Sequence, residues 1–74
     1  MELAGPRSVR VVGPIHYTAE DGHDEVVPVG AAILEAVNAQ LAELVWGEDG
    51  ENAVTLPVTQ LEQAVLDGAL VAAD

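Results

Sequence analysis

The longest apolar stretch of this sequence runs from Pro28 to Trp46, and the rest of the chain must pack against it. Its larger apolar side chains recur at spacings of three and four residues, as on one face of a helix. These side chains are Ile33, Leu34, Val37, Leu41, Leu44 and Val45. Gly47 follows the last apolar position, where a glycine often ends a helix. The sequence therefore predicts a core helix over Pro28–Trp46.

Three other segments have the pattern of strands. Residues 8–18 alternate in side-chain character with a period of two, interrupted by Gly13-Pro14. A polar turn follows over residues 20–25, and its Asp-Gly pair suits a hairpin whose returning strand is Glu25–Val29. Ala53–Val58 predicts a third strand, which the proline at position 57 places at a sheet edge or a strand end.

A second helix is predicted to begin at Thr59. The sequence Thr59-Gln60-Leu61-Glu62 matches a capping box, in which the hydroxyl and the carboxylate satisfy each other's backbone amides. Apolar residues continue at helical spacing toward the C-terminus, and they would leave Gly68 inside the helix.

Together these elements predict a small α+β domain in the order β-β-α-β-α. A chain of 74 residues is long enough for one domain. We expect residues 8–74 to form it, with a three-stranded, mainly antiparallel sheet packed against two helices, and residues 1–7 to be a flexible lead-in.

Charge is the strongest indication of function. The chain has 13 acidic residues against two arginines and no lysine, for a formal net charge of -11 at pH 7. Such a surface repels nucleic acid and anionic membranes and attracts basic proteins. We expect a basic partner to contact the acidic residues of the two turns and the core helix, together with a tryptophan as an interface anchor. These residues are Glu20, Asp21, Asp24, Glu25, Glu35, Glu43, Trp46, Glu48, Asp49 and Glu51.

Catalysis is not predicted. The chain has no cysteine and one serine, and its paired carboxylates lie in open turns where burial does not raise a pKa. We expect no cofactor. His16 and His23 flank several carboxylates, but their spacing matches no known pattern of metal ligands, so no metal site is predicted.

The leading hypothesis is a small acidic, non-enzymatic binding protein that engages a basic protein. An inhibitor that mimics nucleic acid would be one form of it, in the manner of anti-CRISPR, anti-restriction, antitoxin or immunity proteins, an analogy of size and charge. The alternative is an assembly subunit, such as a phage or scaffold component or a homodimer, that associates through apolar positions such as Val12, Val26 and Val71. A metal-binding regulator that uses His16 and His23 is the third hypothesis.

Acidity that serves only solubility or adaptation to high salt is the competing explanation of the charge. The start of the chain has no basic segment followed by an apolar run, and the longest apolar stretch is interrupted by polar residues. We therefore expect a cytoplasmic protein.

Overall fold

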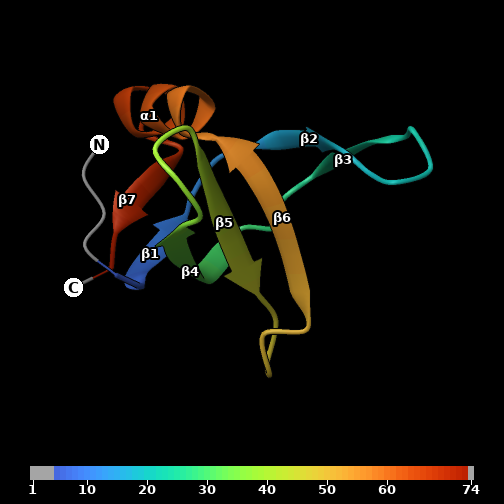
Figure 1. The fold of residues 1–74 in the computed structure, drawn as a ribbon. Helices are drawn as coiled ribbons and strands as arrows, with labels where there is room; N and C mark the ends of the chain where they lie inside the picture. Colours follow the sequence, from blue (N-terminus) through green and yellow to red (C-terminus); the bar gives the residue numbers. More distant parts are fainter. Residues whose placement is uncertain (1–4, 74) are drawn as a thin grey trace.

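The computed structural model describes residues 5–73, and it consists mostly of strands (Figure 1). A five-stranded sheet has the order β6-β5-β4-β1-β7, with all neighbours antiparallel, and β2 and β3 form a separate hairpin. The helix α1 connects the two edge strands β6 and β7. The elements are β1 Arg7–Val11, β2 His16–Thr18, β3 Asp24–Val26, β4 Gly30–Ala36, β5 Leu41–Trp46, β6 Asn52–Pro57, α1 Val58–Leu66 and β7 Leu70–Ala72.

The predicted core helix over Pro28–Trp46 is wrong, because this stretch forms the antiparallel strands β4 and β5. The turn between them is built by Asn38, whose Oδ1 accepts hydrogen bonds from the backbone N–H of Gln40 over 2.8 Å and of Leu41 over 2.9 Å. An asparagine that bonds its own backbone in this way is a turn former. Burial then alternates along both strands, as it does in a sheet with one covered face.

The predicted fold class is therefore also wrong. The structure has five strands in one sheet, two in another and one helix over residues 5–73, in place of three strands and two helices. The strand expected over residues 8–18 divides at Gly13-Pro14 into β1 and β2, which belong to different sheets. The hairpin after it is confirmed, since β2 pairs with β3 in the register His16↔Val26. Its returning strand is Asp24–Val26, and the predicted bounds Glu25–Val29 are wrong. The third strand is confirmed as β6, an edge strand that ends at Pro57.

The second helix exists, but both of its predicted ends are wrong. Its N-cap is Pro57, so Thr59 lies inside the first turn and does not cap the helix. The helix ends at Leu66, and Gly68 follows it with a φ of 76°. The N–H of Gly68 donates to Val65 O over 3.1 Å and that of Ala69 to Ala64 O over 2.8 Å. This is the Schellman arrangement, in which a left-handed glycine terminates a helix.

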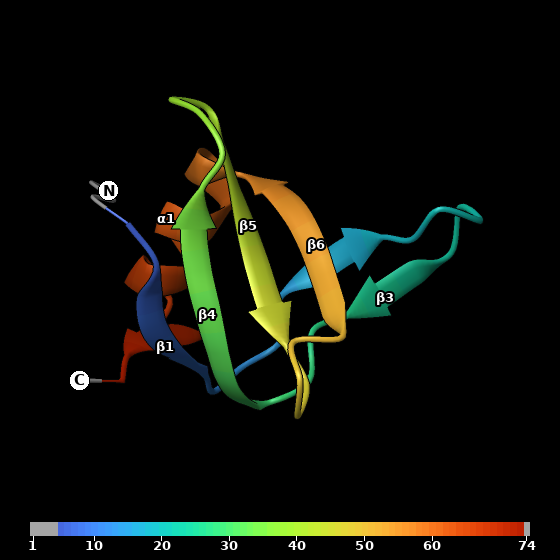
Figure 2. The same ribbon diagram turned by 60° about the horizontal axis from the view of Figure 1, so that its bottom comes forward.

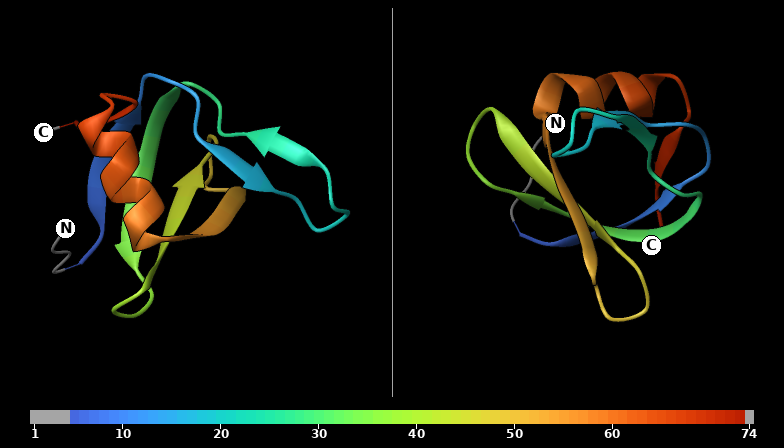
Figure 3. Two further views of the ribbon diagram at one scale, coloured as in Figure 1. Left: turned by 90° about the horizontal axis from the view of Figure 1, so that it is seen from above. Right: turned by 90° about the vertical axis from the view of Figure 1, so that its right-hand side faces the viewer.

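The five-stranded sheet is strongly curled (Figures 2 and 3). The buried side chains of its strands alternate with exposed ones, so they share one face, and they form the core. The helix α1 bridges the edge strands β6 and β7 and inserts Leu61 and Ala64 into this core. The buried side chains are all aliphatic: Val9, Val11, Ile15, Val27, Ala32, Leu34, Ala42, Leu44, Leu56, Leu61, Ala64 and Leu70. Tyr17 and Trp46 are half-buried and pack against this core from outside.

Two predictions about the ends of the chain fall partly outside the described residues. Residues 1–4 of the expected lead-in and Asp74 at the end of the expected domain are among the residues not described, and β1 begins at Arg7. The helical structure found between residues 5 and 73 is too short and too polar to cross a membrane.

Candidate functional site

The acidic residues expected to bind a partner lie in three separate parts of the molecule. Glu20, Asp21, Asp24 and Glu25 belong to the β2–β3 hairpin, which projects away from the five-stranded sheet beyond β6 (Figure 1). Glu48, Asp49 and Glu51 lie in the turn between β5 and β6, at another corner of the molecule. Glu35 and Glu43 lie on β4 and β5. The structure therefore does not gather these carboxylates into one patch.

The carboxylates are nevertheless accessible. Glu43 is half-buried and the other eight acidic residues of the predicted site are exposed. No polar or charged side chain is buried among residues 5–73. The register places Arg7 opposite Leu34 and Arg10 opposite Ala31, so neither arginine directly faces a carboxylate across the β1–β4 ladder.

Glu35 and Glu43 lie directly opposite each other across the β4–β5 ladder. Two like charges placed directly opposite each other destabilise a sheet. Interactions between cross-strand pairs amount to roughly 0.2–1 kcal/mol. Glu43 in turn lies opposite Thr55 on β6. Negative charge therefore lies on the outer face of the sheet close to its β6 edge.

Asp21 organises the tip of the β2–β3 hairpin. Its Oδ1 accepts the backbone N–H of His23 over 3.1 Å, and its Oδ2 lies 2.7 Å from His23 Nδ1. The backbone hydrogen bond and the contact with the imidazole both lower the pKa of Asp21 below its usual value of 3.8. The contact holds the ionised form of Asp21. It therefore stabilises the folded protein above the pKa that Asp21 has in the unfolded chain, and this stabilisation is lost as pH falls through the lower pKa of the folded state.

Metal binding gains no support from this geometry. Among residues 5–73, no group of three or more histidine, aspartate or glutamate side chains is arranged to hold an ion. His23 Nδ1 already contacts Asp21, and His16 lies at the start of β2 opposite Val26.

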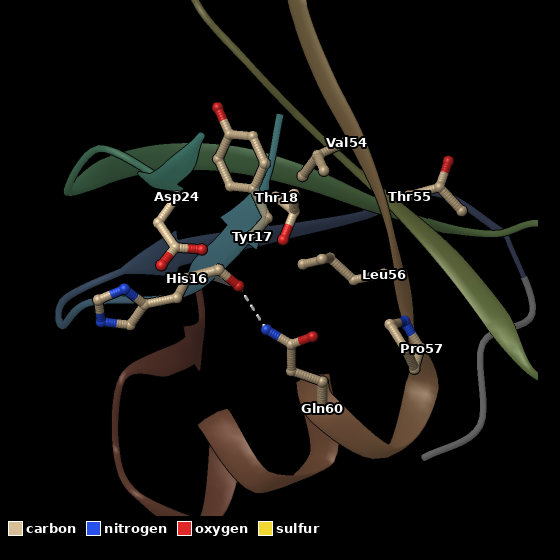
Figure 4. A pocket seen from close by; sticks show the side chains of 9 residues that line it. All are labelled: His16, Tyr17, Thr18, Asp24, Val54, Thr55, Leu56, Pro57 and Gln60. Atoms are coloured by element: carbon tan, nitrogen blue, oxygen red, sulfur yellow. Dashed lines mark hydrogen bonds between the residues drawn. The ribbon is translucent and has the colours of Figure 1, made fainter. Parts of the chain in front are cut away.

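A groove of about 370 Å³ separates the hairpin from the edge of the main sheet (Figure 4). We call it the β2–β6 groove, and its lining residues are His16, Tyr17, Thr18, Asp24, Val54, Thr55, Leu56, Pro57 and Gln60. Gln60 Nε2 donates a hydrogen bond to His16 O over 2.6 Å, which ties α1 to β2 at one end of the groove. Its volume lies near the lower limit of pockets that bind small molecules, roughly 300–1,000 Å³.

Trp46 contacts Tyr17, one of the residues that line this groove. Its ring makes an edge contact with Tyr17, with 6.1 Å between the ring centroids and 60° between the planes. Tyr17 lines the groove, whereas Trp46 packs against the core at the end of β5. Of the expected site residues, only Asp24 lines the β2–β6 groove.

A second hollow, of about 510 Å³, lies on the other side of Gln60. It is formed by the chain that connects β1 to β2 and by α1 with the turn that follows, and Asp67 is its only acidic lining residue. Asp67 Oδ1 accepts a hydrogen bond from Gln63 Nε2 over 3.1 Å, so this carboxylate already has a partner within the helix end.

Sequence reasoning missed Tyr17, Thr55 and Gln60 as residues of a surface site. The capping-box pattern accounts for Gln60 locally, and the strand pattern predicts no neighbour of Tyr17 on another element. The groove joins residues that are about forty positions apart in the chain, such as His16 and Gln60, so local patterns carry no indication of it. Comparisons of the chain with models of protein families, with curated proteins and with solved structures found no match.

Proposed function

We propose that this protein is a small acidic binding protein that engages a basic protein partner. The observation that carries the proposal is the imbalance of exposed charge: a formal net charge of -11, with accessible carboxylates on the hairpin, the β5–β6 turn and the sheet. Two arginines are too few to neutralise these groups by internal ion pairs. A lysine- or arginine-rich surface would relieve the repulsion and gain long-range attraction.

An inhibitor that occupies a nucleic-acid-binding surface is one form of this proposal. Carboxylates can replace phosphates in a basic channel because both attract the same lysine and arginine side chains. The projecting β2–β3 hairpin supports this form, since it carries four exposed acidic residues on an element that extends away from the five-stranded sheet.

The test begins with the protein immobilised at low salt and exposed to an extract of its host. Proteins eluted by a salt gradient are identified, and the dissociation constant of a purified basic one is measured at several salt concentrations. We expect affinity to fall steeply with salt, because the attraction is screened beyond about 10 Å at 0.1 M. Binding that persists in molar salt would contradict the proposal, as would a failure to retain any basic protein.

Two variants, one for each acidic turn, locate the contact. One replaces Glu20, Asp21, Asp24 and Glu25 by their amides, and the other does the same at Glu48, Asp49 and Glu51. We expect the hairpin variant to lose more affinity and to show a shallower salt dependence. Equal, wild-type affinity of both variants would exclude the two turns from the contact.

Self-association is the second candidate function, and the outer face of the sheet favours it. Ile33 and Val71 are 41% and 40% exposed there, so apolar surface on this face is open to a second copy of the chain. Sedimentation of the protein over a range of concentrations tests this candidate. A monomer at all concentrations, with no other copy bound, would exclude it.

A further inference from the structure

The backbone of β6 has one side that no strand of the described chain covers. Val58 N–H donates to Gln40 O over 2.9 Å, and hydrogen-bonded pairs alternate along an antiparallel ladder. Counted back from Val58, every second residue therefore directs its N–H and C=O to β5. The residues between them, Ala53 and Thr55, turn these groups away from β5, and within residues 5–73 β6 has β5 as its one neighbour in the sheet.

The protection of this edge is confined to its end, at Pro57. Exposed edge strands are commonly blunted by charged side chains, by proline or by shortness. The other edge strand of the sheet, β7, has three residues, whereas β6 has six and none of them is charged. Pro57 shares the outward orientation of Thr55, so its missing N–H removes no bond to β5. The exposed part of the edge is therefore Ala53 and Thr55.

The opposite wall of the β2–β6 groove, formed by β2, also presents backbone groups that point away from its neighbouring strand. Ala19 N–H donates to His23 O over 2.8 Å within the β2–β3 hairpin, so by the same alternation Thr18 directs its backbone groups away from β3. Thr18 lines the groove. Between the two strands lie the side chains of Tyr17 and Leu56, which form an apolar floor (Figure 4).

The charged residues in and near this groove favour a basic ligand. Asp24 is the one group among its lining residues that is charged at neutral pH when histidine is neutral. Glu43 lies opposite Thr55 on the neighbouring strand, about two strand spacings, roughly 10 Å, from a strand added beyond β6. Long lysine and arginine side chains cover much of that distance. In a segment that alternates apolar and basic residues, the apolar side chains would lie on the apolar floor and the basic side chains near Asp24 and Glu43.

We propose that β6 is a docking strand, to which an extended basic segment of the partner adds as a further antiparallel strand in the β2–β6 groove. This mode of recognition obtains affinity from main-chain hydrogen bonds and specificity from alternate side chains. The inference rests on the proposed function, since it names the part of the basic partner that is bound. A second copy of this chain is a poorer occupant, because each copy carries a net charge of -11.

The experiment uses a defined probe, an acetylated peptide of alternating lysine and valine as long as β6. Amide hydrogen exchange of the full-length protein is followed by NMR with and without this peptide at low salt. We expect the exchange of Ala53 and Thr55 to slow in the complex, while amides already paired with β5 change little. A peptide of the same composition with D-valine at alternate positions cannot form a regular strand, and it serves as the control.

Two variants separate backbone pairing from the side chain. Thr55→Pro removes the outward N–H, and we expect it to weaken peptide binding about tenfold, the effect of one or two lost hydrogen bonds. Thr55→Val retains the N–H and the β-branched shape, and we expect wild-type affinity. If Thr55→Pro is unfolded, the exchange of Ala53 and Thr55 in the wild-type complex decides the question alone.

The outcomes distinguish this inference from the proposed function. Salt-sensitive peptide binding without slower exchange at Ala53 and Thr55 would overturn the docking strand and leave the basic partner in place. A dimer of the protein alone that Thr55→Pro converts to monomer would overturn it in favour of a second copy. The absence of any salt-sensitive binding, of either peptide or host protein, would overturn both proposals.

Discussion

Gly47 determines the geometry of the turn that carries Glu48, Asp49 and Glu51. Its φ of 105° is in the range that side-chain-bearing residues rarely adopt. A Cβ at this position would also lie 2.9 Å from Glu51 Cγ and 3.1 Å from Asn52 Nδ2. The turn therefore depends on glycine both for backbone conformation and for space.

We expect Gly47→Ala to lower the free energy of unfolding by about 1–3 kcal/mol, the usual cost of a strained backbone conformation. Urea denaturation followed by tryptophan fluorescence measures this change. Gly68→Ala is the matched control, because Gly68 has a φ of 76° but no atom within 4 Å of the added Cβ. An effect at Gly47 no larger than that at Gly68 would show that the crowding contributes nothing.

At this scale the sequence was informative. The Asp21-Gly22 pair predicts the hairpin turn and Pro57 predicts a sheet edge or a strand end, and both features are found. The helix end predicted at Gly47 is wrong, because Gly47 follows the strand β5. Each confirmed feature depends on a property of a single residue, namely a positive φ, a side-chain acceptor or a missing N–H. Two further residues of this kind have a role that the sequence patterns do not predict: Asn38 closes the β4–β5 turn, and Gly68 ends α1.

At the scale of elements, the sequence was misleading between residues 28 and 46. A strand with one covered face shows alternation only when its outer face is polar. Here Ile33 and Val45 lie on the outer face opposite each other, beside the buried Leu34 and Leu44. Apolar residues on both faces hide the period of two, and the remaining spacings of three and four then resemble a helix.

The helix α1 is attached to the core mainly by one side chain. Leu61 is 0% exposed, whereas Leu66 in the same helix is 80% exposed. We expect Leu61→Ala to lower the free energy of unfolding by about 2–5 kcal/mol, because it removes buried methyl groups and leaves a cavity. For a domain of this size that is much of the total stability.

Leu66→Ala provides the control for this prediction, with the same substitution in the same helix. We expect it to change the free energy of unfolding by no more than about 0.5 kcal/mol, as exposed positions usually do. Thermal and urea denaturation of both variants measure the difference. Equal losses from the two substitutions would mean that α1 does not pack on the core through Leu61.

For the whole molecule, the candidate groove was beyond the reach of sequence analysis. It combines the backbone of β2 and β6 with Gln60 of α1, and it forms only when the hairpin is placed beside the sheet edge. The exposure of the carboxylates was easier to anticipate, since charged side chains are rarely buried without partners. Their distribution over three places depends on the topology, and the predicted topology is wrong.

The net charge of -11 predicts a salt-dependent stability that is independent of any partner. Self-repulsion destabilises the compact state, and salt screens it. We expect the free energy of unfolding to rise when sodium chloride is raised from low to moderate concentration. Sucrose at matched osmolality does not screen charge, so a parallel series in it isolates the electrostatic part.

Glu35→Gln tests the same repulsion at a defined pair. Removing the charge opposite Glu43 is expected to raise the free energy of unfolding at low salt by roughly 0.2–1 kcal/mol. The gain should shrink as salt increases, because screening already weakens the repulsion in the wild-type protein. Glu48→Gln, in the exposed β5–β6 turn and outside any strand, is the matched control. If Glu35→Gln is no more stable than this control at low salt, the facing carboxylates do not oppose folding. A basic partner would then have no repulsion between them to relieve.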